Sequence, residues 1–170
     1  NSNLISVGGQ NFTNYSTMSA ASLYSGGENF DNYGLITVDS LATGGNNFIN
    51  HTSAAIIASQ SYISGNSGYN QTGGYIEIGD FLSNGTFTND GDVACTNWTH
   101  GSGIIDGTNG KFCVSTCFIN GGAIQGTIDV CDSSPGGFCD FSFGTIAPSV
   151  TLCGGGGCQS IIGINENVNL

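Results

Sequence analysis

The sequence predicts an all-β fold, a parallel β-solenoid (β-helix) with about 18 residues per turn and a disulfide-braced C-terminal cap. A motif recurs at a spacing of 18 residues, and apolar and polar residues alternate between its copies. This period is too short for a pair of helices but suits one coil of a solenoid, whose residues stack about 4.8 Å from their equivalents in the previous coil. The cap is predicted by the cysteines, which all lie in the second half of the chain.

The repeated motif is GG-x-N-F-x-N, found at 7–15, 25–33 and 43–51 as VGGQNFTNY, SGGENFDNY and TGGNNFINH. Its side chains are expected to stack in columns. The phenylalanines predict an aromatic ladder in the core, made of Phe12, Phe30 and Phe48. The asparagines predict two amide ladders, one of Asn11, Asn29 and Asn47 and the other of Asn14, Asn32 and Asn50. The paired glycines predict corners with a positive φ.

The register can be followed beyond the motif. Ile76, Val93, Phe112 and Val130 each begin a similar run, at spacings of 17, 19 and 18. The pattern breaks down after Asp132. We therefore expect solenoid repeats over 1–132, a Cys/Gly-rich cap over 133–158 and a C-terminal linker or exchanged strand over 159–170.

The seven cysteines favour an oxidising, extracytoplasmic setting. Their spacings lack the Cys-x2-Cys pairs that are typical of zinc sites, so disulfides are expected instead. Connectivity stays open, and the odd count leaves one thiol free or intermolecular; in the predicted register Cys113 and Cys131 share a column and could bridge two rungs. The disulfide candidates are Cys95, Cys113, Cys117, Cys131, Cys139, Cys153 and Cys158.

The charge balance excludes several classes of partner. Lys111 is the single cationic side chain besides two histidines, there are twelve acids, and the formal net charge is −11. Nucleic acids and anionic membranes need Lys or Arg to neutralise phosphate, so neither is an expected partner. No apolar run is long enough for membrane insertion. Because the chain begins at Asn1, we expect that a leader has been removed.

Part of the chain resembles a known group of exported proteins. The stretch from Ile76 to Cys153 is similar to a repeat module of secreted Bacteroidota proteins, and its matching segments are 84–91 (NGTFTNDG), 126–132 (GTIDVCD) and 144–153 (GTIAPSVTLC). The tail 163–170 (GINENVNL) resembles the linker that precedes a type A sorting domain of the type IX secretion system. The resemblance implies export to the cell surface or the medium.

We expect no enzymatic activity and no catalytic residue. Many β-helices are polysaccharide lyases or hydrolases, but a lyase needs a strong base, which Lys111 alone does not supply. A glycosidase needs two carboxylates facing each other across a cleft. The acids considered lie in Asn/Gly-rich turns, where Asp is favoured for its local hydrogen bonds; they are Asp80, Asp90, Asp92, Asp106 and Asp129.

No cofactor or metal is expected, with structural calcium as the alternative. Asp90-Gly-Asp92 and Asp106-Gly-Thr108 offer oxygen ligands, but neither reproduces an EF-hand loop or the nonapeptide of calcium-binding rolls. His51 and His100 are predicted to be solvent-facing turn residues rather than a metal pair.

Glycosylation is a further expectation. Six Asn-x-Ser/Thr sequons occur, at Asn11, Asn14, Asn50, Asn70, Asn84 and Asn97. Asp39-Ser40-Leu41 resembles the O-glycosylation motif of exported Bacteroidota proteins, which makes Ser40 a candidate acceptor.

The leading functional hypothesis is a structural subunit of an extracellular bacterial filament. The register begins at Ile5 without a capping helix, so a second copy is expected to cover the end of the solenoid and to polymerise head to tail. The alternative is a monomeric cell-surface adhesin or glycan-binding module that uses its Asn, Thr and Tyr faces.

Overall fold

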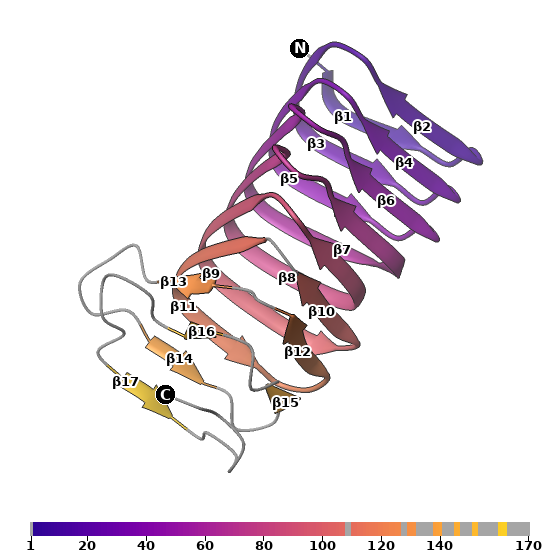
Figure 1. The fold of residues 1–170 in the computed structure, drawn as a ribbon. Coiled ribbons are helices and arrows are strands. Elements are labelled where there is room, and N and C mark those ends of the chain that lie inside the picture. Colours follow the sequence, from indigo (N-terminus) through magenta and orange to yellow (C-terminus); the bar gives the residue numbers. More distant parts are fainter. Residues whose placement is uncertain are drawn as a thin grey trace.

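The computed structural model describes residues 2–107, 110–126, 129–131, 138–140, 145–146, 151–152 and 160–162. These residues form one continuous sheet, in which each strand pairs in parallel with the equivalent strand of the next coil. The sheet winds into a β-solenoid (Figure 1), and the described part of the chain contains no helix. The predicted all-β solenoid is therefore confirmed.

Each of the first coils contains one long and one short strand, which merge into a single bent strand in the middle of the solenoid. The strands that carry side chains discussed below are β1 (Ser2–Val7), β2 (Asn11–Asn14), β3 (Thr17–Ser25), β4 (Asn29–Asn32), β5 (Leu35–Thr43), β6 (Asn47–Asn50), β7 (Ala55–Asn70), β8 (Tyr75–Asn89), β9 (Asp92–Ser102), β10 (Ile104–Gly107), β11 (Lys111–Ile119) and β12 (Ala123–Gly126). The shorter strands that follow are β13 (Asp129–Cys131), β14 (Phe138–Asp140), β15 (Thr145–Ile146), β16 (Thr151–Leu152) and β17 (Ser160–Ile162).

The number of residues per coil changes at the corners and leaves the stacking intact. Asn11 pairs with Asn29, 18 residues on. The spacing becomes 20 between β5 and β7, because the four-residue corner 51–54 replaces the two-residue corner 33–34. The later spacings follow the predicted register, in which Ile76 pairs with Val93. Val93 pairs in turn with Phe112, and Phe112 with Val130.

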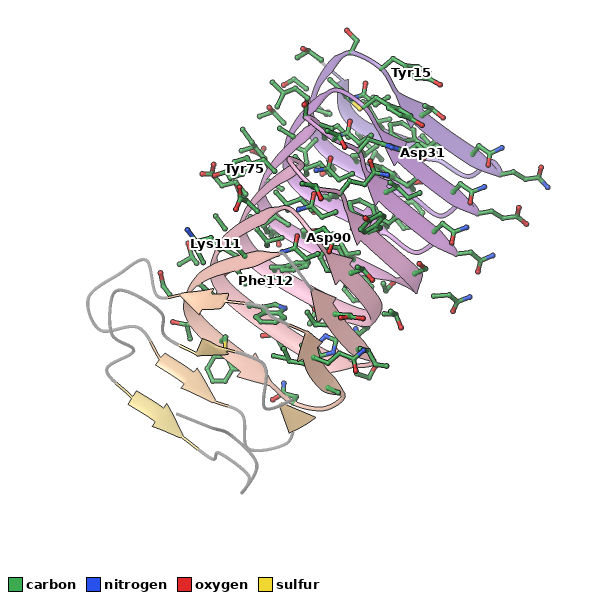
Figure 2. All side chains as sticks on the ribbon, in the orientation of Figure 1. Tyr15, Asp31, Tyr75, Asp90, Lys111 and Phe112 are labelled. Atoms are coloured by element: carbon green, nitrogen blue, oxygen red, sulfur yellow. The ribbon has the colours of Figure 1, made fainter. Side chains whose placement is uncertain are left out.

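The long strand of each coil lines two walls of the core. In β5 the buried side chains are Ile36 and Val38, then Leu41 and Thr43. The interval of two residues becomes three at Asp39-Ser40, so the inward face continues after a bend. The short strand supplies the third wall. Figure 2 shows the result at Phe112, whose ring lies inside the coil.

The phenylalanines of the motif stack in the core. Phe12, Phe30 and Phe48 are 7%, 2% and 4% exposed, and the centroids of successive rings lie 4.8 and 5.1 Å apart. Gly68 occupies this column in the next coil. A Cβ at Gly68 would lie 2.6 Å from the ring of Phe87, which therefore fills the space that a fourth stacked ring would take.

The inner asparagine column extends further than the motif does. It comprises Asn14, Asn32, Asn50, Asn70 and Asn89, all buried. The amide nitrogens of the first four donate to the amide oxygen of the next rung at 2.8–2.9 Å, and that of Asn89 donates to the carbonyl of Lys111 at 3.2 Å. Asn32 also accepts the backbone N–H of Gly34 and donates to its carbonyl. The inner ladder thus satisfies the backbone of the corner that follows each short strand.

The outer asparagine column runs in the opposite direction. Asn29 donates to Asn11 at 2.6 Å, and Asn47 donates to Asn29 at 2.8 Å, both at the exposed surface. The two ladders flank each phenylalanine of the motif, one inside and one outside the coil.

The motif glycines lack the predicted positive φ, and close backbone approach explains the second glycine of the pair in two of the three copies, Gly27 and Gly45. The glycines with positive φ in the described part of the chain are Gly73, Gly85, Gly103 and Gly122, none of which belongs to the motif. A Cβ at Gly27 would instead overlap the carbonyl oxygen of Gly9 in the previous coil. Glycine is required there because consecutive corners stack directly on each other.

The parallel register continues into the segments predicted as cap and linker. β14 pairs with β11 and β17 pairs with β14, so Cys117, Cys139 and Ile161 share one backbone column. Strands β15 and β16 also lie within 133–158. The rest of 133–158 and 159–170, including Cys153 and Cys158, lies outside the described residues.

Candidate functional site

Cys113 and Cys131 lie opposite each other on adjacent rungs, in the one column that the sequence predicts for a pair of cysteines. Cys95 and Cys117 are buried in the core. Cys113 is disulfide-bonded, and the residue opposite it in the next rung is Cys131. Adjacent rungs of a parallel sheet lie about 4.8 Å apart, within the range of Cα separations that a disulfide spans.

Three of the predicted glycosylation sites are inaccessible in the folded chain. Asn14, Asn50 and Asn70 belong to the buried inner ladder, and each amide nitrogen donates to its neighbour. The prediction is therefore wrong for these three, because the sequon arises from the ladder asparagine and the polar residue two positions on. The remaining candidates are exposed or partly exposed, namely Asn11, Ser40, Asn84 and Asn97.

The acids considered for calcium form local contacts. Asp90 accepts a hydrogen bond from the Tyr69 hydroxyl at 2.7 Å, and this bond raises the pKa of Tyr69. Asp106 accepts from Gln125 at 3.2 Å. Among the residues that the structure describes, no three His, Cys, Asp or Glu side chains gather as a metal site would require. Thr108 lies outside the described residues.

Lys111 lies between acids. Its backbone neighbours on the two adjacent rungs are Asp92 and Asp129, and Tyr75 precedes Asp92 in the same column. Figure 2 shows Tyr75 and Lys111 pointing outward from the same side of the solenoid. Lys111 is not among the residues that line the two depressions described below.

The two histidines differ in their exposure to solvent. His51 continues the exposed tyrosine column of the motif, where its ring stacks 3.7 Å from that of Tyr33 and its Nε2 lies 2.8 Å from Asp31. His100 is completely buried, so its prediction as a solvent-facing turn residue is wrong. It occupies an inward position of β9, opposite Ser83 of β8.

His100 belongs to a buried polar network inside the solenoid. The indole N–H of Trp98 donates to Ser83 Oγ at 3.0 Å, and the same oxygen lies 3.0 Å from Nδ1 of His100. Burial lowers the pKa of His100, and the backbone groups of Gly103 and Ser83 partly offset that shift. The imidazole is thereby held neutral within the core.

We predict that stability falls on mild acidification because of His100. Its pKa is lower in the folded chain than in the unfolded one, so the unfolded state binds more protons once the pH drops below about 6.5. The stabilisation is fully present above that pH and is lost as the pH falls toward the folded pKa. Urea unfolding, followed by Trp98 fluorescence at pH 7.5 and 5.5, measures the effect.

The matched variants are His100→Gln and His51→Tyr. His100→Gln is expected to abolish the loss of stability between the two pH values, whereas His51→Tyr restores the aromatic residue of its column and is expected to retain it. A pH dependence that survives His100→Gln would show that another group carries it.

A shallow groove of about 400 Å³ lies on the outer face of the bend between the two long walls, across β5, β7, β8 and β9. We call it the β5–β9 groove. Its polar row consists of Ser40, Gln60, Asp80 and Asn97 on successive rungs. Its second row, on the same rungs, consists of Ala42, Tyr62, Leu82 and Thr99.

The groove combines apolar surface with hydrogen-bonding groups. Tyr62 and Leu82 are 42% and 39% exposed, and the smaller Ala42 and Thr99 lie at either end of their row. In the polar row the amide of Asn97 donates to Asp80 Oδ1 at 2.6 Å. The floor includes Ser61, a buried residue that takes the place of the leucine of the previous coil in its column.

The sequence pattern did not reveal this groove. In each of its two rows one residue comes from each coil, and these residues differ in type, so no motif repeats among them. The signal that was available is the register, because Gln60, Asp80 and Asn97 fall in one column once the coils are aligned.

Comparisons with known proteins do not indicate a function for this chain. No helix in the described part of the chain is long and apolar enough to cross a membrane. No protein-family model, curated protein or solved structure matches this chain.

Proposed function

We propose that this protein is a secreted, non-enzymatic surface module that binds glycans in the β5–β9 groove. The observation that carries the proposal is the pairing of exposed Tyr62 and Leu82 with a parallel row of amide, hydroxyl and carboxylate groups. Sugars present apolar C–H faces and polar hydroxyl edges, and an aromatic ring beside hydrogen-bonding side chains matches both. The resemblance of 76–153 to exported modules supports an extracellular location.

The lining of the groove favours binding over hydrolysis. Asp80 is the one carboxylate among the side chains that line it. Hydrolysis of a glycosidic bond uses two carboxyl groups across the scissile bond, one as acid and one as base or nucleophile. Asp80 is moreover engaged by Asn97, which suits a fixed hydrogen-bond acceptor.

Tyr62→Ala is predicted to weaken glycan binding about tenfold or more, because it removes the largest apolar surface of the groove. Affinity electrophoresis through gels that contain hydroxyethyl cellulose, xylan, glucomannan, dextran or polygalacturonate identifies a binding polysaccharide. Calorimetry then gives the affinities of the variants.

Tyr15→Ala is the matched control for this prediction. Tyr15 is 77% exposed at the corner between β2 and β3, and it does not line the groove. Equal losses from both variants would place binding elsewhere, and the absence of retardation by every polysaccharide would refute the proposal.

A second candidate function, a subunit of an extracellular filament, rests on the first coil. Within the described residues β1 pairs with β3 and β2 pairs with β4, so the other edge of each strand can pair with a strand of a second copy. Such a copy would not continue the inner asparagine ladder, because this column continues after Asn89 with Gly107 and Gly126.

Electron microscopy of the purified protein without ligand separates the two candidates. Regular filaments formed by end-to-end stacking would support the filament, whereas dispersed monomers would leave glycan binding as the function.

In either case we propose that a Cys113–Cys131 bridge braces the C-terminal coils. Peptide mapping under non-reducing conditions would recover the two cysteines in one linked peptide.

A further inference from the structure

We infer that the ligand of the β5–β9 groove is an uncharged, linear polysaccharide whose chain runs along the solenoid axis. This inference rests on the proposed function and adds to it the class of the glycan and its direction. Both additions follow from how the two rows of side chains are arranged.

The direction follows from the register. Gln60, Asp80 and Asn97 are cross-strand neighbours on consecutive rungs, so their polar ends form a line along the axis rather than across the strands. With Ser40 the line spans three rung intervals, roughly 14 Å. A single sugar unit contacts one or two rungs of such a line, whereas an oligosaccharide lying along it contacts all of them.

The second row provides a platform parallel to this line. Tyr62 and Leu82 are cross-strand neighbours, and the Tyr62 hydroxyl lies 3.5 Å from the amide nitrogen of Asn84. Beyond their smaller neighbours Ala42 and Thr99, the same row continues with Tyr24 and Phe118, which are 50% and 37% exposed. The row therefore has an exposed aromatic side chain beyond each end of the groove.

The class of the glycan follows from charge. Asp80 is the one formally charged side chain among the residues that line the groove, and Lys111 lies on a different outward column. With a net charge of −11, the chain repels uronates and sulfated sugars. The hydroxyls of a neutral sugar can instead form hydrogen bonds with the side chains of the polar row. The bond from Asn97 orients the Asp80 carboxylate, whose second oxygen can accept a hydrogen bond from a sugar hydroxyl.

The neighbouring depression is a weaker candidate. It lies on the first wall and is lined by Asp39, Tyr75 and Glu77, among others. The Tyr75 hydroxyl donates to Glu77 at 2.9 Å, so both groups are already paired, and two acids make this surface more repulsive. The β5–β9 groove therefore takes the ligand in this proposal.

The test uses the whole chain and two series of probes. The first compares hydroxyethyl cellulose, xylan, glucomannan and dextran with polygalacturonate and alginate, at matched ionic strength. The second takes the neutral polysaccharide that binds and measures its oligosaccharides from one to six units by calorimetry. We expect the neutral probes alone to bind, and the affinity to rise up to about three or four units before it levels off.

Single variants at different rungs check the direction. Gln60→Ala and Asn97→Ala, two rungs apart, are each expected to weaken binding of the longest oligosaccharide about threefold to tenfold. Each is expected to affect a disaccharide less than the longest oligosaccharide, because a disaccharide can avoid one of the two positions. The same Tyr15→Ala variant serves as the control, with unchanged affinity expected.

Three results would overturn the inference in distinguishable ways. Equal binding of polygalacturonate and neutral glycans would refute the class, and an affinity already complete with one sugar unit would refute the axial direction. Both leave glycan binding itself intact. Failure of every probe to bind would instead refute the proposed function on which the inference rests.

Discussion

Phe30→Ala is expected to lower the free energy of unfolding by about 3–5 kcal/mol. The ring of Phe30 is 2% exposed and stacks on Phe12 at 4.8 Å and on Phe48 at 5.1 Å. Its removal leaves a cavity between two rings that are anchored in their own coils, so the neighbours cannot collapse into the gap. Urea unfolding at pH 7.5, monitored by circular dichroism, measures the change.

Tyr33→Ala is the matched control. Tyr33 is an aromatic residue of the same coil that also stacks between rungs, but it is 46% exposed. Its loss is expected to cost about 1 kcal/mol. A small effect at Phe30 together with a large one at Tyr33 would mean that the ladder faces outward and that the register is shifted by one residue.

The register could be predicted from sequence because a solenoid converts sequence spacing directly into spatial neighbours. Ile76, Val93, Phe112 and Val130 were aligned by their alternating apolar residues, and each pairs with the next in the structure. Insertions at corners change the spacing but leave the inward alternation unaltered. The stacking of the coils could therefore be predicted beyond the region of recognisable repeats.

Burial of individual polar residues was less predictable. His100 follows Trp98 at the interval of two residues that marks inward positions, so the alternation itself pointed inside. The adjacent glycine suggested a turn instead, and this local signal was misleading. Three inner asparagines were similarly predicted as glycosylation sites, because a buried and an exposed Asn-x-Ser/Thr sequon look identical in sequence.

The β5–β9 groove was beyond sequence reasoning for a different reason. The positions of Gln60, Asp80 and Tyr62 are fixed by the register, but a depression depends on the volumes of neighbours in three coils. A small lining residue such as Ala42, next to Tyr62 in its row, matters as much as the residues that contact a ligand. Such a site emerges only after side chains have been placed.

Asn32→Ala is expected to destabilise the solenoid by about 2–5 kcal/mol, although it removes no aromatic or aliphatic group. The side chain of Asn32 is completely buried, accepts from Asn14 and donates to Asn50, and holds both backbone groups of Gly34. Alanine leaves the N–H of Gly34 and the amide oxygen of Asn50 without these partners. Buried polar groups that lose a partner cost about 1–3 kcal/mol each.

Asn29→Ala separates this explanation from a general requirement for stacked amides. Asn29 lies in the same short strand and also bonds to the rungs on both sides, at 2.6 and 2.8 Å, but at the exposed surface. Water replaces the lost partners there, so a change of about 1 kcal/mol or less is expected in the same urea titration. If the two variants cost the same, rung-to-rung amide bonding itself would be the source of stability. If Asn32 costs far more, the inner ladder stabilises the fold because it pairs backbone groups that water does not reach.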